Sequence, residues 1–128
     1  MKKLFTFIVP VFFIGFILSP GLPGNKNWQK NGSFYTAEAR KVIDSKCYGC
    51  HSDQGKSKDA KEALLWDSLP NLSKSSQIAT LDHIIRVLKD KTMPPEGMVR
   101  KYPEMKPSPE EIRILQSWAE FRADSLLK

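Results

Sequence analysis

The chain has 128 residues, with 20 Lys and Arg against 14 Asp and Glu and a formal net charge of +6. This length supports one domain with little left for a second, and a hydrophobic content of 41% argues against wholesale disorder. The basic residues are not interleaved with aromatic residues that would stack on bases, so we expect an acidic or anionic partner and no nucleic-acid binding.

Residues 1–21 have the pattern of a signal peptide or membrane anchor. Two lysines follow Met1, and residues 4–18 are almost wholly apolar. This run is shorter than the about 20 residues that a membrane-spanning helix needs. Ser19 and Gly21 supply small residues at a possible cleavage site. We expect cleavage rather than anchoring by residues 4–19, and in both cases a periplasmic or otherwise extracytoplasmic location.

Residues 22–34 are rich in Pro, Gly, Asn and Lys and predict a linker, which leaves residues 35–128 as the folded domain. The first helix should begin with Thr36 as its N-cap and run to about Cys47. A short second helix should be capped by Asp59 and stopped by Pro70. About a hundred residues remain to build the domain, so a large buried cofactor would add substantially to its core.

The third helix should span residues 76–90, with Ile78, Leu81, Ile85 and Leu88 on one face. Residues 92–107 contain four prolines and should not form a helix. The last helix begins with a strong signal, in which Ser108 is the N-cap, Pro109 the first helical residue and Glu111 the third. No segment shows the alternation of a strand, so the sequence predicts an all-α fold of about four helices.

The segment Cys47-Tyr48-Gly49-Cys50-His51 has the C-x-x-C-H pattern of c-type haem attachment. In that chemistry each cysteine thiol adds to one vinyl group of the haem. The adjacent imidazole then binds the iron from the proximal face. The sequence therefore predicts one covalent haem c, attached through Cys47 and Cys50, with His51 as the proximal iron ligand.

Three other interpretations of the two cysteines remain open. A thioredoxin-like dithiol would need a βαβ context, which a helical chain lacks. A structural zinc ion needs four ligands, and Cys47, Cys50, His51 and His83 supply four, although in no familiar finger spacing. A plain disulfide would leave the adjacent histidine unexplained. The haem hypothesis accounts for all three motif residues and is favoured.

The candidates for the sixth, distal iron ligand are Met93, Met98, Met105 and His83. His83 should face solvent, opposite the apolar face of its helix. Met98 follows Gly97 in a freer stretch, where holding its thioether at the iron would cost more chain entropy. Met93 precedes Pro94, which restricts the backbone before it to an extended conformation. We therefore expect Met93 to be the distal ligand, with Met98 and Met105 as the alternatives.

Three stretches together resemble the small bacterial haem-binding domains of the cytochrome c type. They are the haem motif, Met93-Pro94-Pro95, and residues 103–108 leading into the last helix with Trp118. The similarity covers about residues 35–128. It implies a helical cytochrome c-like fold around one covalent haem, with His51 proximal and a methionine as the sixth ligand, and it places no ligand at Met105.

The expected function is one-electron transfer outside the cytoplasm, without catalysis. The alternatives are a haem-carrying docking subunit of a larger oxidoreductase complex and, less favoured, a haem enzyme or gas sensor with an open distal site. The partner should be a redox protein with an acidic docking face, unless the basic residues near the Met-Pro-Pro loop only aid solubility. These residues are Lys89, Lys91, Arg100, Lys101 and Lys106.

Overall fold

The computed structural model describes residues 33–128, so the predicted signal peptide and almost all of the predicted linker lie outside the described part. Its elements are α1 (Ala37–Val42), a π-helical turn η2 (Ile43–Cys47), α2 (Lys58–Ala63), a 3-10 turn η3 (Leu69–Asn71), α3 (Lys74–Lys89), α4 (Glu96–Lys101), a second 3-10 turn η4 (Pro103–Met105) and α5 (Pro109–Leu127). No strand occurs in residues 33–128, so the prediction of an all-α domain is confirmed for this part.

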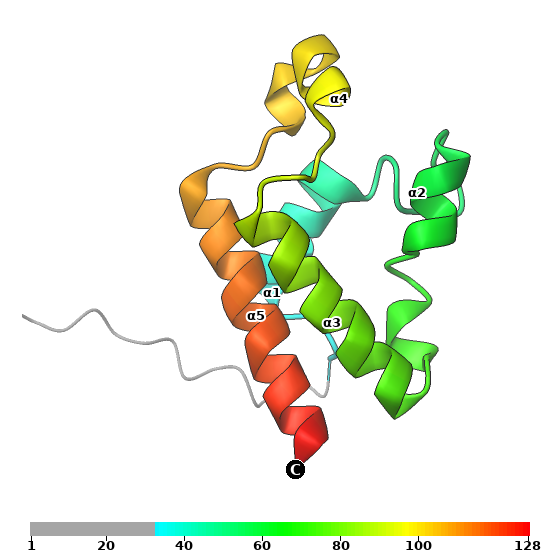
Figure 1. Ribbon diagram of the computed structural model, residues 1–128, viewed down its shortest axis with the longest axis vertical. Helices are drawn as coiled ribbons and strands as arrows, with labels where there is room; N and C mark the ends of the chain where they lie inside the picture. The colour runs from blue at the N-terminus through cyan, green and yellow to red at the C-terminus, as the bar shows by residue number, and fades with distance from the viewer. Residues whose placement is uncertain (1–32) are drawn as a thin grey trace, which may run out of the picture.

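The core lies where α3 and α5 pack side by side and α1 packs against α5 (Figure 1). Trp118, Leu115 and Leu81 are buried at this junction. The remaining buried apolar residues are Ala39, Val42, Ile43, Trp66, Leu69, Ile84, Leu88 and Ala119. Within the described residues, no helix is long and apolar enough to cross a bilayer.

The helix starts follow local capping signals. Thr36 accepts a hydrogen bond from the backbone N–H of Ala39, as predicted. Ser108 and Glu111 form the predicted capping box at the start of α5, with Pro109 at the first helical position. α3 begins at Lys74, two residues before the predicted start, because its N-cap is Ser73.

The buried face of α3 is rotated from the predicted one. Leu81 and Leu88 are buried as expected, but Ile84 is buried while Ile78 and Ile85 are half-buried. Gln77 is also buried, and its side-chain amide donates to the carbonyl oxygens of Pro70 and Leu72. The periodicity of the sequence predicted the buried face of α3 to within about one residue. Its exact rotation is set by the packing against α5.

Two other expectations are wrong. The cap of α2 is Ser57 rather than Asp59, and the helix is not stopped by Pro70 but ends earlier, at Ala63, because Leu64 is extended. Residues 92–107 do contain helix, since α4 lies between Pro95 and Pro103, where no proline interrupts it. Pro95 stands at the N-cap position, where the missing N–H is not needed. Residues 33–128 therefore hold five α-helices instead of about four.

An aromatic cluster joins the start of the described chain to its last helix. Phe34, the final residue of the predicted linker, accepts a hydrogen bond of 3.1 Å on its carbonyl oxygen from the indole N–H of Trp118. The Tyr35 ring stacks on Trp118, with centroids 5.2 Å apart, and its hydroxyl donates to the carbonyl oxygen of Trp66. These contacts fix the segment before α1 against the core and join it to Trp66.

Candidate functional site: a pocket lined by thiols, an imidazole and thioethers

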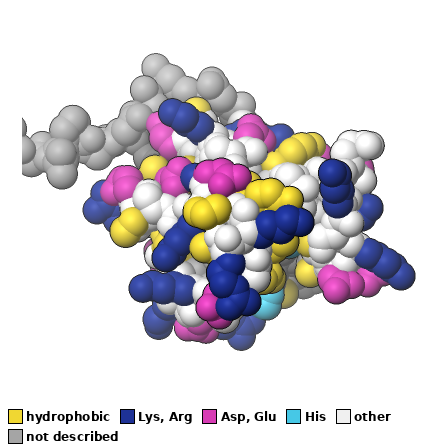
Figure 2. Space-filling view, turned by 90° about the horizontal axis from the view of Figure 1, so that it is seen from above, with side chains coloured by type: hydrophobic (Ala, Val, Ile, Leu, Met, Phe, Trp, Pro, Cys, Tyr) yellow, Lys and Arg dark blue, Asp and Glu magenta, His cyan; other side chains and the backbone are white. Residues whose placement is uncertain are grey.

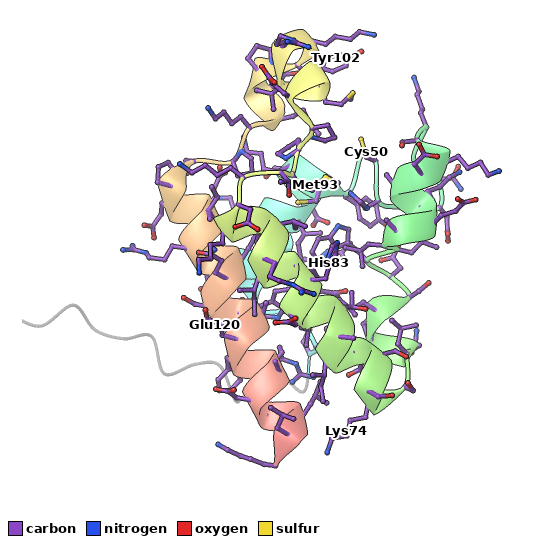
Figure 3. The ribbon with its side chains drawn as sticks, viewed as in Figure 1. Cys50, Lys74, His83, Met93, Tyr102 and Glu120 are labelled. Atoms are coloured by element: carbon purple, nitrogen blue, oxygen red, sulfur yellow. The ribbon has the colours of Figure 1, made fainter. Side chains whose placement is uncertain are left out.

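A pocket at one end of the packed helices α3 and α5 brings the predicted site residues together. It contains about 500 Å³ of empty space, which includes space open to solvent. Figure 3 shows Cys50 and Met93 at this same end of the molecule. The lining residues are Lys46, Cys47, Cys50, His51, Leu88, Met93, Pro94, Pro95, Met98, Met105 and Pro107.

Cys47 is placed by the π-helical turn η2, which the sequence did not reveal. The N–H of Tyr48 donates to the carbonyl oxygen of Ile43 at 2.8 Å, the i to i+5 bond of a π-helix. The carbonyl oxygen of Cys47 then accepts from the N–H groups of both Cys50 and His51 at 3.1 Å. A tight turn therefore carries the chain from one thiol to the other and on to the imidazole.

The Cys47 thiol packs against the hydrophobic core. Burial raises the pKa of this thiol to about 12, and the neighbouring Cys50 and the Glu111 carboxylate act in the same direction, while Lys46 opposes them. In the unloaded protein Cys47 is therefore a neutral thiol at physiological pH. A neutral thiol reacts with oxidants more slowly than a thiolate.

Gly55 closes the loop that follows the motif. Its N–H donates to the carbonyl oxygen of Ser52 at 2.8 Å, and the residue is buried. A Cβ atom at position 55 would lie 2.3 Å from the carbonyl oxygen of Cys50. Only glycine fits this approach, so the loop after the motif folds back closely on the motif itself.

The imidazole of His51 is oriented by a backbone partner. Its Nδ1 atom lies 3.1 Å from the carbonyl oxygen of Leu64. The main chain of His51 is held too, because its own carbonyl oxygen accepts from the N–H of Trp66 at 3.1 Å. A carbonyl oxygen can only accept, so Nδ1 must carry the proton, and the lone pair of Nε2 is left for a metal ion.

Three methionines contribute thioethers to the same pocket. Met93 is 39% exposed and is followed by Pro94 and Pro95, which also line the space. Met98 belongs to α4, so it lies on a short helix, although that helix contains no buried residue. Met105 belongs to η4, and its terminal methyl group lies 3.9 Å from where a Cβ atom of Gly49 would be. Met98 and Met105, the two alternatives to Met93 as an iron ligand, therefore both line the pocket.

The zinc alternative finds no assembled ligand set. His83 is exposed on α3 and does not line the pocket, as predicted (Figure 3). Among residues 33–128, no group of three or more His, Cys, Asp or Glu side chains is placed to hold a metal ion. Cys47, Cys50, His51 and His83 are therefore not gathered as four zinc ligands.

A charged cluster, which could not be predicted from the sequence, packs against the outer side of the C-x-x-C-H motif. The Arg40 guanidinium lies 5.1 Å from the ring centroid of Tyr48 and 5.7 Å from that of Tyr35. Arg40 also forms ion pairs with Asp44 at 2.8 Å and Asp67 at 3.5 Å. The Tyr48 hydroxyl donates to Asp67, and this bond raises the pKa of the phenol. The motif is thereby joined to α1 and to the segment after α2.

The residues of the predicted basic face are all exposed. Figure 2 looks onto this end of the molecule and shows Lys and Arg side chains together with hydrophobic and acidic ones. Arg100 pairs with Glu96 at 3.5 Å, and the Lys101 ammonium lies 5.2 Å from the ring centroid of Tyr102. Lys89, Lys91 and Lys106 form no ion pair with any described residue.

The chemistry of the pocket is that of soft and borderline donors in an apolar space. Two thiols, one oriented imidazole and three thioethers line it, with leucine and proline side chains between them. No protein-family model, curated protein or solved structure matches this chain.

Proposed function

We propose that this protein is a monohaem c-type cytochrome that transfers single electrons outside the cytoplasm. One observation carries the proposal. The two cysteines and the histidine of the C-x-x-C-H motif line one apolar pocket. Three methionine thioethers from residues 93–105, more than 40 positions further along the chain, line the same pocket. Neither a structural disulfide nor a zinc site accounts for this combination.

The residues present fit a covalent haem. Cys47 and Cys50 would hold it through thioether bonds, His51 would bind the iron through Nε2, and Met93 would be the distal ligand. The contact of His51 Nδ1 with the carbonyl oxygen of Leu64 and the apolar lining both suit a buried iron porphyrin. When bound, haem supplies a one-electron Fe(III)/Fe(II) couple, whose potential is raised by methionine ligation.

The lining favours electron transfer over catalysis. No Asp, Glu, Ser, Thr or Tyr side chain lines the described pocket, and Lys46 is the sole charged residue in it. A haem enzyme needs an open distal position with polar or acid–base groups beside it. Here the distal wall is made of methionine and proline, which can ligate or exclude water but cannot move protons.

The test is expression of the full chain with cytochrome c maturation machinery, followed by a denaturing gel stained for haem peroxidase activity. A stained band of the protein's size that survives acid-acetone extraction is expected. The Cys47→Ala/Cys50→Ala double variant should lose the band, because it has no thiol to add to a vinyl group. His83→Ala, at the histidine outside the pocket, is the matched control and should keep it. Complete extraction of haem from the wild-type protein would refute covalent attachment.

A further inference from the structure

Lys46 stands immediately before the first haem-motif cysteine and is the one charged residue in the described lining of the pocket. Only 19% of its side chain is exposed. Because most of the side chain is covered, the position of its ammonium group is restricted, and its partners can be identified. The position of those partners indicates what the residue does.

The ammonium group of Lys46 reaches across to two segments that follow the Met-Pro-Pro loop. Nζ donates to the carbonyl oxygen of Glu104 at 2.6 Å, and it lies 3.9 Å from Oε2 of Glu111. The same Glu111 oxygen accepts from the N–H of Ser108 at 2.7 Å, as part of the capping box of α5. One side chain in η2 is therefore bonded to η4 and to the first turn of α5.

The segment from Glu96 to Met105 has little else to hold it. α4 contains no buried residue, and among the described elements its backbone lies against η4 only. η4 in turn lies against η2, the turn that carries Lys46. Figure 1 shows α4 and the turn after it projecting beyond the ends of α3 and α5. Few buried contacts make such a segment prone to local opening.

We propose that Lys46 is a positioning residue that holds the segment 96–105 over the pocket, and so keeps Met98 and Met105 against the haem site. The inference rests on the proposed function for its consequence at the iron. The interaction of Lys46 with the segment does not depend on a bound haem. A hydrogen bond from a charged donor is stronger than a neutral one. Loss of the ammonium group should let the segment open and admit water and small ligands.

The variants separate this role from general stability. Lys46→Met keeps most of the aliphatic stem and removes the charge and the donor. Lys46→Arg keeps both and should restore the interaction. Glu111→Gln removes only the longer ion pair and keeps the carbonyl bond and the N3 cap, so it should have little effect. Lys58→Met is the matched control, at an exposed lysine that pairs with Glu62 at 3.6 Å on α2.

The measurement is amide hydrogen exchange on the haem-loaded protein, with carbon monoxide binding to the reduced form as a second readout. In Lys46→Met, amides of residues 98–106 should exchange at least about fivefold faster, while those of α3 and α5 keep their protection. Carbon monoxide should replace the Met93 thioether on the reduced iron faster in the same variant, because the pocket is then less covered. Lys46→Arg, Glu111→Gln and Lys58→Met should resemble the wild type.

Unchanged exchange in residues 98–106, or an equal rise in all helices, would overturn the role of Lys46. If Lys46→Met does not fold, Lys46→Arg is compared with Glu111→Gln. Faster exchange in Glu111→Gln alone would show that the ion pair with Glu111 holds the segment. It would refute the hydrogen bond to the carbonyl oxygen of Glu104 as the main interaction. Absence of covalent haem in the wild type would refute the proposed function instead. Exchange in the unloaded chain then still measures whether Lys46 holds the segment.

Discussion

Nδ1 of His51 lies 3.1 Å from the carbonyl oxygen of Leu64, a residue 13 positions further along the chain. The segment after α2 thus sets the orientation of the imidazole in the pocket. We predict that His51 in the unloaded protein is the Nδ1–H tautomer. Two-bond nitrogen–proton NMR correlations at neutral pH will show this, with the exposed His83 as internal control. A predominant Nε2–H form of His51 would contradict the assignment of Nε2 to the iron.

The capping box of α5 should be worth a measurable part of the domain's stability. The Ser108 hydroxyl accepts from the N–H of Glu111 at 3.2 Å, and the Glu111 carboxylate accepts from the N–H of Ser108 at 2.7 Å. Ser108→Ala should lower the free energy of unfolding by about 1 kcal/mol. Urea titration of the unloaded or loaded protein will measure this. Ser117→Ala, at an exposed position within the same helix, should change it by less than about 0.5 kcal/mol. Equal effects of the two substitutions would show that the capping box does not contribute to the stability of the domain.

The parts of the fold that could be predicted from the sequence are those with local causes. Thr36 and Ser108 begin helices because a side-chain oxygen and a backbone N–H three residues on are brought together by the helix itself. The π-helical turn at Ile43–Cys47 has no such local signal. Whether Ile84 or Ile85 is buried depends on how α3 sits against α5, which the periodicity of one helix does not determine.

The site divides in the same way. Cys47, Cys50 and His51 are adjacent in sequence, so their chemistry was readable from spacing alone. Met105 enters the pocket because η4 packs against η2, a contact between distant segments. The demand for glycine at Gly55 comes from a close approach to the carbonyl of Cys50 that exists only in the folded loop. The pairing of Lys46 with Glu104 spans 58 residues and was equally hidden.

Tyr35 should make the domain sensitive to alkali. Burial raises the pKa of its phenol above the usual value; Arg40 opposes this shift and Asp67 supports it. The unfolded chain releases this proton near pH 10, whereas the folded chain retains it, so the unfolded state binds fewer protons above that pH. Stability should therefore fall as pH rises above about 10, and Tyr35→Phe should make this fall shallower.

At pH 7, Tyr35→Phe should lower the free energy of unfolding by about 1 kcal/mol, because it removes the hydrogen bond to the carbonyl oxygen of Trp66. Denaturant titrations at pH 7 and at steps from pH 9 to pH 11 will separate the two effects. Tyr102→Phe, at a tyrosine that is 40% exposed, is the control. An unchanged alkaline slope in Tyr35→Phe would show that another group governs it.

The basic residues around the pocket predict a salt-dependent association with an acidic redox partner. Lys89 and Lys106 are exposed and form no ion pair with any described residue, so their fields are not locally cancelled. Lys89→Glu and Lys106→Glu should each lower the association rate and flatten its dependence on ionic strength. Stopped-flow electron transfer to an acidic acceptor protein will measure both. Lys74→Glu, at the far end of α3 (Figure 3), is the control. A rate that is the same at low and moderate salt would identify the lysines as solubilising charges.

Met93, Met98 and Met105 all line the pocket, and we predict that Met93 is the iron ligand. Met93 is followed by two prolines that restrict the backbone before each of them, so its thioether is presented from a stiffened segment. Met98 and Met105 lie on the segment held by Lys46, which has few buried contacts of its own. A weak iron–sulfur bond is better maintained from the stiffer support.

The haem-loaded Met→Ala series decides among the three methionines. Met93→Ala should lose the sulfur-to-iron charge-transfer band of the oxidised protein, lower the reduction potential and open the reduced iron to carbon monoxide. Met98→Ala and Met105→Ala are matched controls, since each removes one thioether from the same pocket, and both should keep the band. If Met93→Ala keeps the band and its potential while one of the other two variants loses them, the ligand is carried by α4 or η4. The segment that Lys46 holds would then carry the axial ligand itself.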